Sequence, residues 1–370
     1  MAGEAPIRVG VIGASADRGW GHHAHVPAIR ALPQYRLEGV ATARAGSADR
    51  AAALFGAPLA FGDPLALIAH PDIDLVAITV KVPSHRDLAL AAIAAGKHVY
   101  CEWPLGHGIA QCEEMAAATR GGGVRVAIGL QGRSAPALRQ ARDLVANGYV
   151  GRVLSTSLVV SAEHLLGEMP EELETLLYPQ FGTTMFTVHF GHLMDMLCFC
   201  LGEFASLSAT LATRRPEVTI IETGRTAIGT APDHIALSGM LESGATATVH
   251  LRGGHSRGAN AFWEINGTEG DLLLTGDHGN MHIAPLALHG GRRDHFGLSL
   301  LPIDPRWRWV GGEVPDGAPF NVAQTYALLA DDIRTGSRTC PDFDDGLRRH
   351  RLLAAVEEAD ATGLRQSYAR

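Results

Sequence analysis

Small residues follow the first apolar segment of the chain and could bind the phosphates of a dinucleotide. Residues 7–20 read I-R-V-G-V-I-G-A-S-A-D-R-G-W, an apolar run that breaks into a glycine-marked turn. Such a turn lets the backbone at a helix N-terminus approach a pyrophosphate. The usual G-x-G-x-x-G is not intact, because Ser15 replaces the second glycine and the loop continues to Gly21 before a helix expected to begin near His25. The residues expected at the pyrophosphate are Gly13, Ser15, Gly19 and Trp20.

The end of the second apolar segment indicates which dinucleotide fits. A carboxylate at this position would hydrogen-bond the ribose 2′-hydroxyl of NAD and repel a 2′-phosphate. The segment ends in G-V-A-T-A-R, so Thr42 stands where the acid is expected and Arg44 offers a guanidinium to a phosphate. These two residues favour NADP(H), with NAD(H) as the second possibility. The alternative is that Arg44 is an ordinary solvated loop residue.

A histidine and an aspartate in the second half of the chain are the candidates for proton transfer. His189, His192 and Asp195 are spaced by three, so they share one face of a helix. His192 could act as the acid or base while Asp195 orients its imidazole. The alternative is a buried histidine that is hydrogen-bonded to a neighbour. A metal site would need a further ligand that no motif supplies, and we expect no metal.

Three more polar residues could take part in the chemistry, each with a plainer alternative. Lys81 follows the fourth strand, at the carboxyl edge where ligands of open parallel sheets bind, unless it is only a solvated lysine. Tyr178 could donate a proton to a carbonyl group or merely pack in a loop. Arg133 ends the segment L-Q-G-R and could bind a substrate oxygen or carboxylate. The cofactor contacts expected at this edge are Val80, Lys81, His85, Glu102, Trp103 and Gln131.

Two kinds of sheet are expected to position these residues. Apolar runs at 36–42, 74–80, 97–102 and 124–128 alternate with alanine-rich helical segments, which predicts a parallel sheet of strand–helix–strand units. After a helix at 135–147, strands are predicted in direct succession at 204–213, 234–241, 245–251, 261–266, 271–275 and 280–283. Helices are predicted at 320–335 and 346–363.

These elements predict an α/β protein of two domains. Residues 1–133 form an N-terminal Rossmann-like, doubly wound parallel sheet that binds the dinucleotide. Residues 134–370 form a C-terminal α+β domain with a large open, mainly antiparallel sheet for substrate binding and oligomerisation. The last helices are free to pack back on the first domain.

The composition limits the class of protein. A chain of 370 residues is long enough for two domains, and its apolar share of 46% contains no run of about 18 apolar residues that would cross a membrane. The N-terminal residues do not form an export signal, and the odd number of five cysteines fits the reduced cytoplasm. The net charge of -8 and the lack of a long basic run argue against a nucleic-acid partner.

The segment 94–105 carries a family resemblance. It reads A-A-G-K-H-V-Y-C-E-W-P-L and resembles the signature A-G-K-H-V-x-C-E-K-P-L of the Gfo/Idh/MocA family of oxidoreductases. Closer still is the likeness to the subgroup around the fungal galactose-regulon repressor. Its motifs S-x-x-x-G-W, E-W, L-Q-G-R, F-G-H-x-x-D and P-D-H appear at residues 15–20, 102–103, 130–133, 190–195 and 232–234. The resemblance covers nearly the whole chain.

Two residues depart from the enzymes of this family. The resemblance implies a lysine of E-K-P at the nicotinamide, acting with an aspartate and a histidine of the second domain. In this chain Trp103 replaces the lysine and Val188 stands at the aspartate position, so only His192 remains of the three.

Two hypotheses follow from the resemblance and its departures. We favour an NADP-dependent oxidoreductase that acts on a sugar-like or cyclic alcohol or carbonyl group in the cleft between the domains, with Trp103 as a stacking wall and His192 as the acid or base. The alternative is a catalytically degenerate dinucleotide sensor that acts through a protein partner. Under either hypothesis the open sheet predicts a homodimer or homotetramer, because its uncovered face must be covered.

Overall fold

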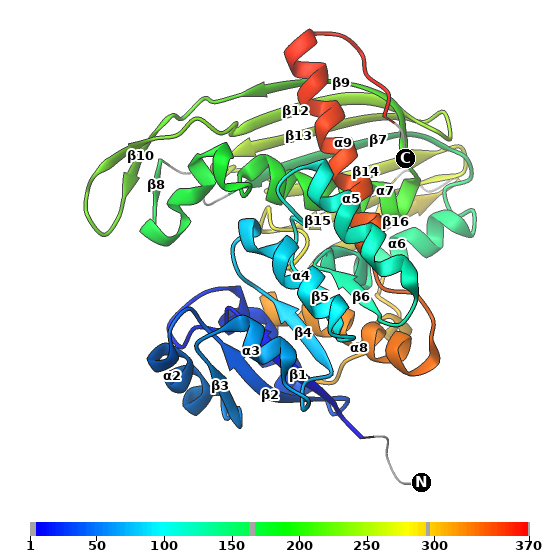
Figure 1. Ribbon diagram of the computed structural model, residues 1–370. Helices are drawn as coiled ribbons and strands as arrows, with labels where there is room; N and C mark the ends of the chain where they lie inside the picture. The colour runs from blue at the N-terminus through cyan, green and yellow to red at the C-terminus, as the bar shows by residue number, and fades with distance from the viewer. Residues whose placement is uncertain (1–4, 163–166, 294–296, 369–370) are drawn as a thin grey trace. The chain divides into compact units, whose positions relative to one another are not determined.

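The computed structural model describes residues 5–162, 167–293 and 297–368, which divide into two compact units (Figure 1). Unit 1 comprises Met1–Ser134 and Arg308–Leu347, and unit 2 comprises Ala135–Trp307 and Arg348–Arg370. The segment that carries helix α8 (Ala318–Thr335) therefore belongs to unit 1, although it follows the whole sheet of unit 2 in the sequence.

Unit 1 is built on a six-stranded parallel sheet with the strand order β3-β2-β1-β4-β5-β6. The strands are β1 (Ile7–Ile12), β2 (Tyr35–Ala41), β3 (Leu59–Phe61), β4 (Leu75–Ile78), β5 (His98–Cys101) and β6 (Val126–Ile128). The order reverses between β1 and β4, which is the switch point at which doubly wound sheets bind dinucleotides. The prediction of a doubly wound parallel sheet is confirmed.

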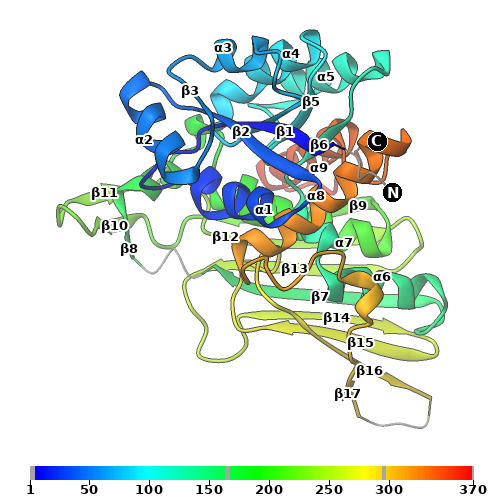
Figure 2. The ribbon, with the colours of Figure 1, turned by 90° about the horizontal axis from the view of Figure 1, so that it is seen from below.

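Helices cover both faces of this sheet, which explains why its strands are almost wholly apolar. One face packs against α1 (Val26–Ala31), α2 (Ala45–Phe55) and α8. The other face packs against α3 (Pro64–Ala69), α4 (His85–Ala94) and α5 (Ile109–Ala118). Figure 2 shows α1 and α8 on one side of the sheet and α3, α4 and α5 on the other.

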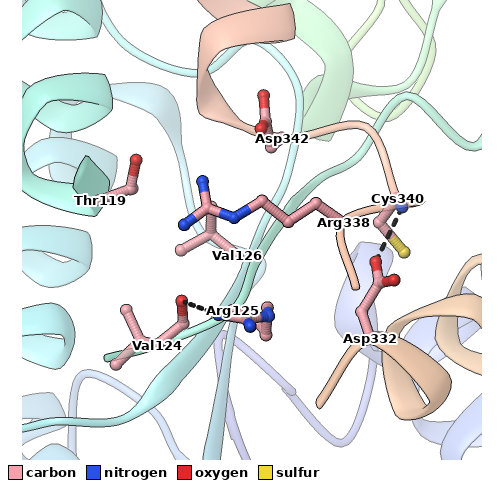
Figure 3. A pocket seen from close by; sticks show the side chains of 8 residues that line it. All are labelled: Thr119, Val124, Arg125, Val126, Asp332, Arg338, Cys340 and Asp342. Atoms are coloured by element: carbon pink, nitrogen blue, oxygen red, sulfur yellow. Dashed lines mark hydrogen bonds between the residues drawn. The ribbon is translucent and has the colours of Figure 1, made fainter. Parts of the chain in front are cut away.

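A small hollow at the start of β6 marks where the chain returns from α8 to the sheet (Figure 3). The Asp332 carboxylate accepts hydrogen bonds from the backbone N–H of Thr339 and of Cys340, at 2.8 and 2.9 Å. Burial opposes ionisation of Asp332, but these hydrogen bonds lower its pKa. The hollow is lined by Thr119, Val124, Arg125, Val126, Asp332, Arg338, Cys340 and Asp342. It lies at the amino edge of the parallel sheet, opposite the edge where ligands bind.

Unit 2 is built on an eight-stranded sheet with the order β17-β16-β15-β14-β7-β13-β12-β9. Its strands are β7 (Val153–Ala162), β9 (Phe204–Ala212), β12 (His234–Leu241), β13 (Thr246–Gly253), β14 (Ala261–Gly267), β15 (Gly270–Gly276), β16 (Ala287–Arg292) and β17 (Ser299–Leu300). Every pair is antiparallel except β7 and β13. The prediction of a large, mainly antiparallel sheet is confirmed. A second sheet joins β8 (Glu168–Met169), β10 (Glu217–Ile220) and β11 (Thr226–Ile228).

One face of the large sheet is covered and the other is open. Helices α6 (Pro136–Ala146), α7 (Gly191–Leu201) and the later part of α9 (Phe343–Thr362) lie along the covered face (Figure 1). Along β12 and β13 every second side chain is buried, whereas Ser238, Met240 and their alternate neighbours are exposed. This alternation is what an antiparallel sheet with one solvated face requires.

The segment 280–283, predicted as a strand, forms a turn instead, so this prediction was wrong. The backbone N–H groups of Ile283 and Ala284 both donate to the carbonyl oxygen of Asn280, at 2.9 Å. A Cβ at Gly279 would collide with the carbonyl oxygen of Ser161, so only glycine allows the turn to approach the end of β7 so closely. The next strand, β16, begins only at Ala287.

Candidate dinucleotide site and buried histidine pair

The turn after β1 in unit 1 has the close backbone approach that a dinucleotide site needs. Gly13 has a φ of +100°, and a Cβ there would lie 2.9 Å from the backbone of Thr79. The turn ends in a π-helical segment, Gly21–His25, which continues directly into α1, so the helix begins a few residues earlier than predicted. The indole Nε1 of Trp20 is buried and has no partner within the described chain. A buried donor of this kind is satisfied when a ligand supplies an acceptor oxygen.

The end of β2 presents a hydroxyl and a cation where a carboxylate would select NAD. The Thr42 hydroxyl lies 2.5 Å from the hydroxyl of Ser47 and donates to the carbonyl oxygen of Arg44 at 3.0 Å. Arg44 immediately precedes α2, and its side chain is exposed. The loop therefore leaves a guanidinium open to solvent beside the N-terminus of an eleven-residue helix. Both features attract an anion.

The E-W-P turn after β5 is held by buried hydrogen bonds. His25 Nε2 donates to Glu102 Oε1 at 2.7 Å, and His25 Nδ1 lies 2.8 Å from the Tyr326 hydroxyl. The His25 and Tyr326 rings are fully buried, and Trp103 is 5% exposed. The turn is thus tied to the helix that follows the phosphate turn and to α8.

His85 fixes the other side of the same turn. Its Nδ1 lies 2.9 Å from the carbonyl oxygen of Pro104, and its Nε2 lies 2.9 Å from that of Val80. Burial lowers the pKa of this histidine. The ring therefore connects the end of β4 to the E-W-P turn through the backbone. Lys81 follows Val80 and is exposed.

Gln131 and Arg133 follow β6 in a 3₁₀ turn, Gln131–Ser134. Their side chains differ in the hydrogen-bond and ion-pair partners that they have. Gln131 is 1% exposed, and its Oε1 is buried without a hydrogen-bond partner in the described part of the chain. Arg133 forms an ion pair with Asp345 of α9, at 3.2 Å. The Gln131 amide is therefore open to a ligand that carries a donor, whereas the charge of Arg133 is balanced within unit 1.

The candidate acid or base of unit 2 is stacked on a second histidine. His192 is 4% exposed, and its ring lies parallel to that of His282 with centroids 3.9 Å apart. Burial, together with the nearby His189, lowers the pKa of His192 to about 3. The imidazole is therefore neutral, and its burial disfavours the protonated form. No motif in the sequence singles out His282, which lies in the segment 280–283 that was predicted as a strand.

Asp195 and Tyr178 have partners of their own in unit 2. Asp195 is 1% exposed and forms an ion pair with Arg349 at 3.8 Å, and Arg349 also pairs with Glu203. Burial opposes ionisation of Glu203, but Arg349 lowers its pKa to about 2. The Tyr178 hydroxyl donates to Glu174 over a long 3.4 Å. Asp195 thus belongs to a buried ion network.

The polar candidates therefore form two groups. Unit 1 carries the phosphate turn, the Thr42 and Arg44 loop, and the polar residues that follow β4, β5 and β6. Unit 2 carries His192, Asp195 and Tyr178. Within the described ranges no cluster of three or more His, Cys, Asp or Glu side chains could hold a metal ion. None of the helices in those ranges is both long and apolar enough to cross a membrane.

Fold and site together define a two-domain Rossmann protein with a dinucleotide-binding unit. Residues 7–130 match the model of the oxidoreductase family with an NAD-binding Rossmann fold, and residues 136–276 match that of the Gal80p C-terminal domain. The chain is 31% identical to the dehydrogenase aclE of Aspergillus oryzae over 98% of both chains. The chain belongs to the Gfo/Idh/MocA family of oxidoreductases, in which it resembles Gal80.

Two further comparisons come from a regulator of the same family. The galactose/lactose metabolism regulatory protein GAL80 of Saccharomyces cerevisiae is 28% identical over 97% of this chain and 94% of its own length. The crystal structure of a super-repressor mutant of Gal80p from the same yeast superposes with a TM-score of 0.88 at 24% identity, over 98% of both chains. The chain thus resembles both a dehydrogenase and a regulator along nearly its whole length.

Proposed function

We propose that this protein is an NADP(H)-preferring oxidoreductase that transfers a hydride to or from a sugar-like or cyclic alcohol or carbonyl compound. The observation that carries the proposal is the buried, neutral His192, retained at the position where the family places its catalytic histidine. The exposed Arg44 guanidinium and the uncharged Thr42 support the preference for a 2′-phosphate. The likeness to the dehydrogenase aclE supports enzymatic activity.

The residues present fit a dinucleotide, and each has its own role in the reaction. The bound dinucleotide supplies or accepts the hydride. The buried Nε1 of Trp20 and Oε1 of Gln131 lack partners among the described residues and offer it a donor and an acceptor. We assign proton transfer with a substrate hydroxyl to His192, whose buried imidazole is neutral before the reaction. Trp103 provides an apolar wall, and Lys81 and Tyr178 are the secondary candidates for proton transfer.

A second candidate function is a dinucleotide-binding regulator that acts through a protein partner. It is favoured by Trp103 and Val188, which stand where the family's dehydrogenases carry a lysine and an aspartate. The likeness to the GAL80 regulator supports it as well. Neither tryptophan nor valine can move a proton, so a chain under selection for regulation alone could have lost these groups.

Turnover separates the two functions. The purified protein is assayed with NADP(H) and NAD(H) against a panel of sugars, polyols and cyclic ketones, following the absorbance of the reduced nicotinamide, while cofactor binding is measured by fluorescence quenching. Turnover with any member of the panel supports the enzyme. Tight cofactor binding without turnover across the panel favours the regulator. Trp103→Lys is the companion variant, since it harms turnover if the indole is the substrate wall and leaves cofactor binding unchanged in a regulator.

We further propose that the protein is a cytoplasmic homodimer or homotetramer. The five cysteines are all buried thiols, which fits a reducing compartment. The open face of the large sheet presents small residues such as Ser238 and Thr248 beside the exposed Met240, a flat surface suited to a second copy.

A further inference from the structure

A continuous chain of hydrogen bonds runs through unit 1 from α8 to the end of β5. It links the Tyr326 hydroxyl to His25 Nδ1 at 2.8 Å, and His25 Nε2 to Glu102 Oε1 at 2.7 Å. Tyr326 and His25 are fully buried, and the Glu102 side chain is 11% exposed. The rings of Tyr100 and Tyr35 pack against Tyr326. Little water therefore screens the carboxylate.

The hydrogen-bond partners assign the protons along this chain. A carboxylate only accepts, so His25 Nε2 carries the hydrogen that it shares with Glu102. In the described part of the chain, the Tyr326 hydroxyl has His25 Nδ1 as its hydrogen-bond partner, so its hydrogen points there. A doubly protonated His25 would leave that hydroxyl hydrogen buried and unpaired, which is costly. The imidazole is therefore neutral, and the chain carries one net negative charge, on Glu102.

The place of Glu102 in the fold puts this charge on the nicotinamide side of the sheet. The pyrophosphate binds at the turn after β1, and Thr42 and Arg44 mark the adenosine side at β2. The second nucleotide must extend the other way from the switch point, over the carboxyl ends of β4, β5 and β6. Glu102 immediately follows β5. A Cβ on Gly129, after β6, would collide with Glu102 Oε2, so this glycine makes the room that the carboxylate occupies.

Among the described residues, no lysine or arginine at this edge pairs with Glu102. Lys81 is exposed after β4, Arg133 is paired with Asp345, and burial lowers the pKa of His85. The only side-chain hydrogen-bond or ion-pair partner of Glu102 in the described ranges is the neutral His25. Where family members carry the lysine of E-K-P, this chain has Trp103. An aromatic face adds attraction for a cation and no positive charge.

We propose that the Tyr326–His25–Glu102 chain makes this protein select the oxidised form of its dinucleotide over the reduced form. The two forms share their phosphates and adenosine, but the nicotinamide ring is cationic when oxidised and neutral when reduced. A fixed negative charge beside the ring therefore stabilises only the oxidised form. The resting enzyme then binds the oxidised dinucleotide, which is the form that alcohol oxidation requires. Under the regulatory alternative, the same charge makes the protein a sensor of the oxidation state of its cofactor. The inference rests on the proposed dinucleotide site and does not require turnover.

Equilibrium binding tests the charge directly. Dissociation constants for NADP+, NADPH, NAD+ and NADH are measured by calorimetry for the wild type, Glu102→Gln and Glu102→Asp. We expect the wild type to bind the oxidised form of its preferred dinucleotide more tightly. Glu102→Gln should reduce the oxidised-to-reduced preference about tenfold, equivalent to about 1.4 kcal/mol, with most of the loss in the oxidised form. Glu102→Asp keeps the charge and should retain most of the preference even if both affinities fall.

The outcomes separate the two proposals. If no dinucleotide binds to the folded wild type, the proposed function fails. If both forms bind the wild type equally, or if Glu102→Gln weakens both forms by the same factor, the dinucleotide site stands and the role of the charge is overturned. Circular dichroism establishes that each variant is folded, and the ratio of oxidised to reduced affinity of the wild type tests the proposal if Glu102→Gln is not.

Discussion

The imidazole rings of His192 and His282 lie face to face, with centroids 3.9 Å apart and planes inclined by 4°. His192 comes from the first turn of α7, and His282 comes from the turn before β16. Two positively charged rings would repel each other at this distance, which disfavours protonation of both rings together. The stack fixes the plane of His192 and keeps water from one of its faces.

Replacing His192 should abolish most of the activity while leaving the cofactor bound. A positioned acid or base contributes about a hundred- to ten-thousand-fold, and we expect His192→Ala to lose activity on that order. The phosphate turn lies in unit 1, so the affinity for NADP(H) should change by less than about twofold to threefold. Steady-state kinetics and fluorescence titration of the same preparation measure both quantities. Turnover that persists in His192→Ala would remove the assigned role.

His282 should act through His192 and not on the substrate. His282→Phe keeps a flat ring against His192, so we expect kcat to stay within a few-fold of the wild type. His282→Ala removes the stack and admits water, which should raise the pKa of His192 toward its ordinary value and shift the acid limb of the pH–rate profile upward. Equal profiles for the two variants would contradict a positioning role.

The low pKa of His192 predicts a loss of stability in acid. Its pKa is about 3 in the folded protein, against 6.5 ordinarily, because burial and His189 disfavour the charged ring. Between these values the unfolded chain binds more protons than the folded one, so stability falls as pH falls from about 6.5. Two pH units lower, the loss from this residue is about 3 kcal/mol. Urea unfolding across this range should show a shallower pH dependence in His192→Phe, whereas the exposed His23→Gln should match the wild type.

Local patterns in the sequence predicted the two kinds of sheet and many of their strands, although β7 and β16 were not predicted. The contacts within the sites depend on distant partners. The strands β1, β2, β4, β5 and β6 lie in apolar runs, whereas β3, Leu59–Phe61, was not predicted. The residues that orient the sites are far apart in the chain. Tyr326 and His25 are separated by 301 residues, and no local sequence pattern predicts their hydrogen bond. The stack of His282 on His192 likewise depends on the approach of Gly279 to the end of β7.

The loop after β2 should determine the preference for NADP(H). We expect NADP(H) to bind more tightly than NAD(H), and Arg44→Ala to reduce that preference about tenfold, since a guanidinium–phosphate interaction contributes about 1 to 3 kcal/mol. Arg50→Ala is the matched control, because Arg50 is also exposed but lies further along α2, where it donates to the carbonyl oxygen of Gly46 at 3.2 Å. Fluorescence titration with both dinucleotides gives the ratios. A preference that survives Arg44→Ala unchanged would show that another feature sets it.

The open face of the large sheet should carry the homo-oligomer. A charge placed on a flat face that packs against its own copy meets an identical charge across the two-fold axis, so Ser238→Arg should convert the oligomer to a monomer at micromolar concentration. Asn147→Arg, an exposed position after α6, adds the same charge away from this face and should leave the oligomer intact. Size-exclusion chromatography with light scattering gives the mass of each form. A monomeric wild type, or an oligomer unaffected by Ser238→Arg, would place the contact elsewhere or rule it out.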